Sequence, residues 1–137
     1  MKKKVLIITA SYYLDITKSL KTDAELLLEK SKIRFDVIDV PGVFEIPVTI
    51  AKNIKKYDGF IALGCVIKGE TPHFDFISKT TFEGLMKLSI NSKKPIGNGI
   101  ITSLDFQQAI QRSGTNNKDK GKGKEATRAV ISVLSQK

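Results

Sequence analysis

His73, the only histidine of this 137-residue chain, lies in a stretch suited to proton chemistry. The continuous apolar run over residues 59–67 is typical of a strand buried on both faces of a parallel sheet. A Lys-Gly turn follows, Thr71 is a favourable N-cap, and Pro72 suits the first position of a helix. We therefore expect His73 in the first turn of a helix, where free N–H groups favour an anion and an imidazole can transfer protons.

Further candidate groups follow the ends of the other predicted strands. Tyr12 follows the first strand, Phe44 and Glu45 follow the second, and residues 97–103 hold the end of the fourth. Because the carboxyl ends of parallel strands meet at one edge of a sheet, these groups should converge into one ligand site. Each of these residues also has a simpler explanation. Tyr12 could be an ordinary surface aromatic, Phe44 a core residue, and Glu45 a carboxylate that only stabilises the start of its helix through the helix dipole. For His73 the alternative is a helix start without a chemical role.

Strands and helices alternate along the whole chain, which predicts a parallel sheet with helices on both faces. The expected strands cover residues 4–9, 35–40, 59–67 and 95–101. The expected helices cover residues 17–30, 45–55 and 72–91, and a short fourth helix ends at Arg112 behind a capping box of Thr102 and Asp105. A polar loop to Gly123 and a last helix follow. No repeat or linker divides the chain, so we expect one domain over residues 1–137.

Apolar stripes at helical spacing predict which helix faces meet the sheet. The expected core positions are Leu20, Ala24, Leu27 and Leu28 in the first helix and Val48, Ala51 and Ile54 in the second. In the third helix they are Phe74, Ile77, Thr81, Leu85 and Leu88, and in the last helix Ala126, Ala129, Val130, Val133 and Leu134.

Composition narrows the functional classes. Cys65 is the only cysteine, so the chain has no internal disulfide, a zinc site is not expected, and a reducing cytoplasm is the expected location. No apolar run is long enough to cross a membrane or to form a signal peptide. The net charge is +9. We expect no nucleic-acid partner, because the lysines are spread out apart from Lys2–Lys4 and Lys118–Lys124; the alternative, a basic nucleic-acid binder, predicts salt-sensitive binding.

Three segments resemble the signature blocks of the lumazine synthase family: residues 41–47 (PGVFEIP), 63–75 (LGCVIKGETPHFD) and 107–114 (QQAIQRSG). The resemblance implies a flavodoxin-like three-layer sandwich with strand order 2-1-3-4. It also implies synthesis of 6,7-dimethyl-8-ribityllumazine in riboflavin biosynthesis, by condensation of 5-amino-6-ribitylaminouracil with 3,4-dihydroxy-2-butanone 4-phosphate. Phosphate and water are released, and no metal or other cofactor is needed.

The resemblance also implies roles for individual residues. Proton transfer falls to His73, and Arg112 clamps the phosphate. Tyr12 would stack on the pyrimidine, and the ribityl and ring pocket would be lined by Val43, Phe44 and Glu45. The uracil would contact Cys65, Val66 and Ile67, and the phosphate would contact Glu70 and Thr71. The two remaining substrate-binding residues that the resemblance implies are Asn98 and Lys120. Three features depart from the family pattern: Asn98 stands where many members carry a stacking Phe, Gln111 replaces a frequent acid, and the loop over 115–121 differs.

In this family the site lies between neighbouring subunits of a pentamer, so Asn98, Arg112 and Lys120 would come from the adjacent chain. The resemblance therefore implies a homo-oligomer, either a pentamer or a 60-subunit shell, with riboflavin synthase as a partner enzyme. The alternative is a protein of the same fold that holds a flavin or lumazine without catalysis, and Asn98 is the residue that raises it.

Overall fold

Four parallel strands form the centre of the molecule. The computed structural model describes residues 2–69, 73–114 and 121–137. Within these ranges β1 (Lys4–Ala10), β2 (Arg34–Val40), β3 (Gly59–Ile67) and β4 (Ile96–Ser103) form one sheet. The strand order is β2-β1-β3-β4, and every neighbouring pair is parallel, so the predicted order is confirmed.

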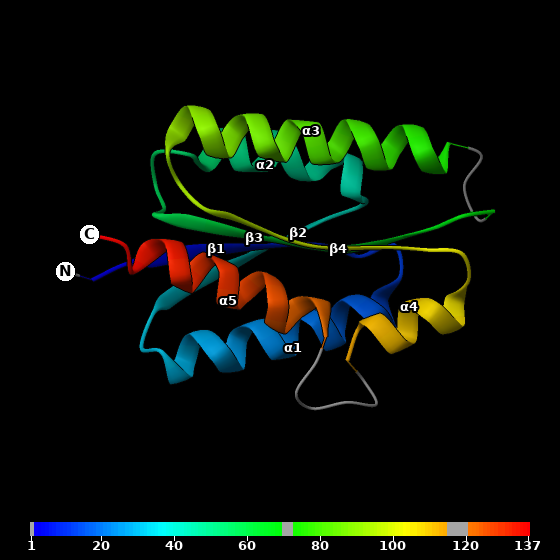
Figure 1. Ribbon diagram of the computed structural model, residues 1–137, viewed down its shortest axis with the longest axis horizontal. Coiled ribbons are helices and arrows are strands. Elements are labelled where there is room, and N and C mark those ends of the chain that lie inside the picture. Colours follow the sequence, from blue (N-terminus) through cyan, green and yellow to red (C-terminus); the bar gives the residue numbers. More distant parts are fainter. Residues whose placement is uncertain (1, 70–72, 115–120) are drawn as a thin grey trace.

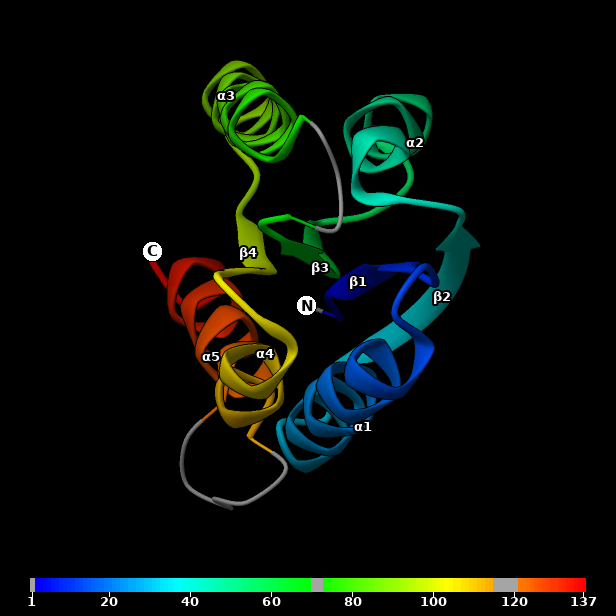
Figure 2. The ribbon, with the colours of Figure 1, turned by 90° about the vertical axis from the view of Figure 1, so that its right-hand side faces the viewer.

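Helices cover both faces of this sheet and complete three layers (Figure 1). One face carries α2 (Ile46–Asn53), preceded by the short 3-10 helix η1 (Val43–Glu45), and α3 (Phe74–Ser92). The other face carries α1 (Leu14–Lys30), α4 (Phe106–Arg112) and α5 (Lys122–Leu134). Figure 2, which looks along the strands, shows both helical layers clearly separated by the sheet.

The strands alternate their side chains between two apolar cores. Val5 and Ile7 of β1 pack with α1 and α5 through residues such as Leu20, whereas Leu6 and Ile8 pack with α2 and α3. All nine residues of β3 are buried, as expected for a strand covered on both faces. Each large apolar side chain fully buried in this way contributes about 1.5–3 kcal/mol.

Close contact between α5 and β4 depends on glycine. A Cβ atom at Gly97 would lie 2.5 Å from the carbonyl oxygen of Ala126 and 2.8 Å from a methyl group of Val130. A Cβ atom at Gly99 would lie 2.5 Å from a methyl group of Leu63. The two glycines therefore let α5 approach the edge of the sheet.

Two predicted helix faces are partly wrong. In α2, Val48 is 58% exposed and Ala51 is also exposed, whereas Ile46 and Ile50 are fully buried. The helix α2 continues directly from the 3-10 turn of η1, which fixes how α2 is rotated about its axis. With this rotation the face that meets the sheet carries Ile46, Ile50 and the partly buried Ile54, which recur every four residues. In α5, Ala129 and Val133 are exposed, because the small residues Gly123, Ala126 and Thr127 form the buried face with Val130.

Several predicted helix ends also need correction. The N-cap of α3 is His73, whose backbone is not helical, so His73 precedes the first turn; Thr71 and Pro72 lie outside the described residues. The cap of α4 is Asp105 alone, whose carboxylate accepts a hydrogen bond of 2.8 Å from the Gln108 N–H, because Thr102 belongs to β4. The helices α1 and α5 begin earlier than expected, at Leu14 and Lys122.

Candidate active site

An aromatic hollow of about 190 Å³ lies at the carboxyl ends of β1 and β3. Its lining combines the end of β3, the loops after β1 and β2, η1 and the first turn of α3: Tyr12, Tyr13, Gly42, Val43, Phe44, Cys65, Val66 and Ile77. The structure thus brings together five of the sequence-predicted residues, Tyr12, Val43, Phe44, Cys65 and Val66. We call this cavity the aromatic hollow.

Two rings of this hollow face solvent, whereas the third, Tyr13, packs against the core. The side chain of Tyr12 is 66% exposed and that of Phe44 is 59% exposed, so the core alternative for Phe44 is wrong. Tyr12 packs edge-to-face on Tyr13, with ring centroids 4.9 Å apart. Exposed aromatic faces beside an apolar floor are suited to stacking on a flat ring.

Local hydrogen bonds hold the two loops that carry these rings. The Ser11 N–H donates to the carbonyl oxygen of Val40 over 3.0 Å, which ties the loop after β1 to the end of β2. The Glu45 carboxylate accepts a hydrogen bond of 3.0 Å from the Gly42 N–H, which closes the η1 turn. Glu45 therefore positions the turn and does not line the hollow, and Ile67 is buried in the core instead.

Cys65 is the only thiol in this hollow, and it is 6% exposed. Burial raises the pKa of the Cys65 thiol to about 12. A thiol that stays protonated near neutral pH is a poor nucleophile, so Cys65 contributes shape and backbone groups rather than covalent chemistry.

His73 stands at the start of α3 with an exposed side chain. Its carbonyl oxygen accepts the first hydrogen bond of the helix, 2.8 Å from the Ile77 N–H. The imidazole lines neither of the hollows described in this section. The neighbouring predicted residues Glu70 and Thr71 lie outside the described residues, as does Lys120.

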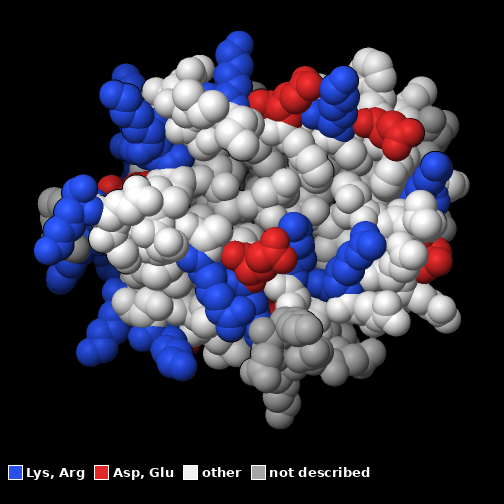
Figure 3. Space-filling model, in the orientation of Figure 1, with Lys and Arg blue, Asp and Glu red and all other residues white. Residues whose placement is uncertain are grey.

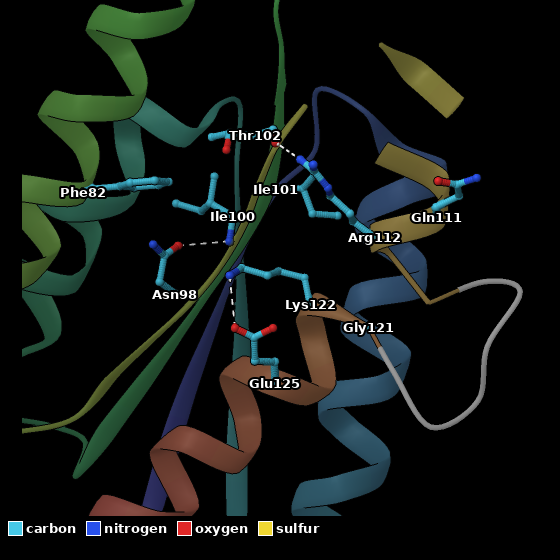
Figure 4. A pocket seen from close by; sticks show the side chains of 10 residues that line it. All are labelled: Phe82, Asn98, Ile100, Ile101, Thr102, Gln111, Arg112, Gly121, Lys122 and Glu125. Atoms are coloured by element: carbon cyan, nitrogen blue, oxygen red, sulfur yellow. Dashed lines mark hydrogen bonds and ion pairs between the residues drawn. The ribbon is translucent and has the colours of Figure 1, made fainter. Parts of the chain in front are cut away.

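A second hollow, of about 420 Å³, lies beside the edge strand β4 (Figure 4). Arg112 reaches it from the end of α4 and donates a hydrogen bond to the carbonyl oxygen of Thr102. The side-chain oxygen of Asn98 accepts a hydrogen bond of 3.1 Å from the Ile100 N–H. We call this cavity the cationic hollow; its lining is Phe82, Asn98, Ile100, Ile101, Thr102, Gln111, Arg112, Gly121, Lys122 and Glu125.

Lys122 is the second cation of this hollow, and its ammonium group pairs with the Glu125 carboxylate over 3.3 Å. Neither residue was assigned to the site from the sequence. Lys122 fell within the expected loop, which extended to Gly123, and Glu125 is an exposed residue of the last helix that no pattern singled out. Tyr13 follows Tyr12 in the same loop and also lines the aromatic hollow, although the family resemblance implies no role for it. Gln111 was visible only as a departure beside Arg112.

Seven of the predicted site residues line a cavity, five of them the aromatic hollow and two, Asn98 and Arg112, the cationic hollow. No residue lines both hollows, and the aromatic hollow has no cation among its described lining residues. Over the described residues, no group of three or more His, Cys, Asp or Glu side chains is placed to hold a metal ion. None of the described helices is long and apolar enough to span a membrane.

Comparison with known proteins decides which family this geometry represents. The family model of 6,7-dimethyl-8-ribityllumazine synthase matches residues 2–137. The chain belongs to this family. A lumazine synthase of Agrobacterium fabrum is 41% identical over 143 aligned positions, covering 99% of this chain and 95% of the relative. The Bartonella tribocorum enzyme is 40% identical, and the alignment covers 100% of this chain and 93% of the relative. The enzyme of Beijerinckia indica subsp. indica is also 40% identical, and the alignment covers 95% of this chain and 73% of the relative. The flavodoxin-like α/β fold expected for a lumazine synthase is the one described above.

Proposed function

We propose that this chain is a 6,7-dimethyl-8-ribityllumazine synthase of riboflavin biosynthesis, which condenses 5-amino-6-ribitylaminouracil with 3,4-dihydroxy-2-butanone 4-phosphate. Family membership over residues 2–137 supports the reaction. The observation that carries the proposal is the presence of two hollows of different chemistry, one aromatic and one cationic. These are the two chemistries that a flat uracil ring and a phosphate ester require.

The aromatic hollow is proposed to bind the ribitylaminouracil. The exposed faces of Tyr12 and Phe44 are available for stacking, which is worth about 0.5–1.5 kcal/mol for an aromatic pair. The backbone at the end of β3, over Cys65, Val66 and Ile67, is the proposed partner for the uracil edge. Val43 shapes the floor, and Glu45 holds the turn that carries Phe44.

The cationic hollow is proposed to bind the phosphate of the butanone. Arg112 presents a planar guanidinium, which suits two oxygens of one phosphate. Asn98 and Lys122 add donors to the same cavity. Glu70, Thr71 and Lys120, which lie outside the described residues, remain proposed substrate contacts on the basis of the family motif alone.

We propose that two copies of the chain complete one site. The aromatic hollow, at about 190 Å³, is smaller than the roughly 300–1,000 Å³ of ordinary ligand pockets. A neighbouring copy that presents its cationic hollow would enlarge it and supply the missing charge. The proposed assembly is a homo-oligomer, either a pentamer or a 60-subunit shell. Riboflavin synthase, which consumes the product, is the proposed partner enzyme, and the cytoplasm the proposed location.

The reaction mainly requires that the protein holds its two substrates together in the correct orientation. The substrate amine and ketone lose water to form an imine, phosphate leaves, and a second water is lost when the ribitylamino nitrogen closes the pyrazine ring on the remaining carbonyl carbon. Holding two reactants together can lower the barrier by about 7–11 kcal/mol. A proton-transfer group adds roughly 10²–10⁴-fold, and His73 is the proposed group.

Mixing both substrates with the protein and following lumazine absorbance tests the reaction. A mixed-oligomer experiment tests the shared site. His73→Ala and Arg112→Ala are refolded together at equal amounts and assayed at a butanone phosphate concentration far below the KM of Arg112→Ala, where each variant alone has little activity; roughly a quarter of the interfaces then hold an intact His73 and an intact Arg112. Recovery of activity toward that fraction is expected. No recovery, with mixing verified by mass, would place the site within one chain.

A further inference from the structure

The end of the molecule opposite the candidate active site is strongly basic. The segments at the amino ends of the four strands contain eleven of the 23 Lys and Arg residues: 2–4, 30–34, 55–56, 93–94 and 137. In Figure 3 many Lys and Arg side chains gather on the left-hand side, where both termini lie in Figure 1. We call this surface the basic pole. The expectation that the lysines are spread out is therefore wrong, because the parallel topology gathers segments that are distant in sequence.

Two acids of the basic pole, Asp36 and Asp58, are already occupied. The Asp58 carboxylate accepts a hydrogen bond of 2.8 Å from the Lys4 N–H. Asp36 accepts one of 2.7 Å from the Tyr57 hydroxyl and pairs with Lys4 over 3.0 Å. Among the ion pairs of the described residues, none involves the other cations of the pole. Most of the positive charge there is left for an external partner.

Backbone conformation gives a second, independent observation. Among the described residues, the only non-glycine residues with positive φ are Lys32, at 58°, and Lys93, at 59°. Both stand directly behind helices, at positions where glycine is strongly favoured, and a side chain there costs roughly 1 kcal/mol. Helix C-termini point to this pole, so cations there offset part of that cost. Lysine nevertheless occupies both strained turns of the basic pole.

The basic pole is also concave. A hollow of about 380 Å³ is lined by Lys3, Lys93, Lys94 and Lys137, with Asp58 as its only acid. The four lysines come from three separate segments of the chain and surround the same hollow. The depression is suited to an anionic group that passes across it.

We propose that the basic pole binds the phosphodiester backbone of nucleic acid without reading its sequence. Lysine-rich surfaces are typical of phosphate contacts, whereas protein interfaces are depleted in lysine and anchored by aromatic residues. The aromatic ring at the pole is Tyr57, which is already in contact with the Lys4 ammonium, 5.6 Å from the ring centre, and with the ring of Phe60, so it is poorly placed to stack on bases. This activity is separate from the proposed catalysis, because the two lie at opposite ends of the sheet.

Fluorescence anisotropy of the full-length protein with a labelled DNA duplex of about two helical turns tests the proposal. If about five phosphates are contacted, affinity should fall roughly 500-fold between about 50 and about 200 mM salt. The double variant Lys32→Gly with Lys93→Gly removes two cations from strained turns, so the fold should be kept. Its affinity should fall at least about tenfold, with a salt slope smaller by roughly two.

The matched control is Lys18→Gln with Lys79→Gln, which removes the same charge from exposed helical positions toward the other end. It should retain most of the affinity. Equal losses in both double variants would mean that only net charge matters and would overturn the basic pole as the site. The proposal is also overturned if the duplex does not bind at about 50 mM salt, or if polyglutamate of equal charge binds as tightly.

Discussion

Arg112, the last residue of α4, is hydrogen-bonded to the backbone carbonyl oxygen of Thr102 in β4. This contact orients the guanidinium at the cationic hollow before any substrate is bound. Arg112→Ala should therefore raise the KM for the butanone phosphate by about 10–100-fold, since a hydrogen bond to a charged group is worth about 1.5–3 kcal/mol. The matched control is Arg128→Ala, an exposed arginine on α5. An unchanged KM in Arg112→Ala would assign the phosphate to another group.

The side chain of His73 is exposed, and among the described residues none forms a hydrogen bond with its imidazole. The imidazole is therefore not needed to hold the fold together. His73→Ala should lower kcat by about 10²–10⁴-fold while leaving thermal stability and oligomer mass unchanged. Steady-state kinetics and light scattering on one sample provide both readouts. Wild-type turnover in this variant would refute proton transfer by His73.

Asn98 presents an amide in the cationic hollow, where many relatives are expected to carry a stacking ring. Asn98→Phe should lower the KM for the ribitylaminouracil several-fold, because aromatic stacking contributes about 0.5–1.5 kcal/mol. Asn98→Ala, which removes the amide without adding a ring, is the comparison. If both variants bind the uracil substrate equally, the ring does not reach residue 98.

Packing of α5 on β4 leaves no room for a side chain at Gly97. Gly97→Ala should destabilise the fold by about 1–3 kcal/mol, because α5 must move away from the sheet. Gly84→Ala is the matched control: its Cβ would meet Pro47 at an ordinary 3.4 Å, and alanine in a helix gains about 0.8–1.0 kcal/mol. Urea unfolding of both variants should therefore give shifts of opposite sign.

Because of the buried Cys65 thiol, the free energy of unfolding should fall markedly at alkaline pH. The folded-state pKa of about 12 lies above the value of about 8.5 in unfolded chains. Its stabilising effect is complete below about pH 8.5 and is lost as pH rises toward 12, because only the unfolded thiol ionises. Cys65→Ala should flatten this alkaline loss of stability. Iodoacetamide should label the unfolded protein quickly at pH 9 and the native protein slowly; equal rates would contradict the buried thiol.

The parallel sheet and the convergence of Tyr12 and Phe44 were predictable from the sequence, because alternating elements and parallel strand ends leave few arrangements. The strand order and the place of Cys65 in the site followed from the family resemblance. Helix rotation was not. Val48 and Ala51 fit a helical period, but η1 determined which face of α2 meets the sheet. Lys122 escaped prediction because nothing local shows that α5 starts before Gly123. The separation of Arg112 from Tyr12 could be expected only from the family resemblance, since spacing alone does not reveal a site divided between chains.

The hydrogen bond between Asn98 and the Ile100 N–H has a consequence for how copies associate. β4 is an outer strand of the sheet, and such strands offer free backbone donors to any further strand that approaches. Asn98 occupies one of these donors with its own side chain. Extension of the sheet across β4, the route to uncontrolled aggregation, is thereby disfavoured, and copies that meet at this edge must recognise each other through side chains.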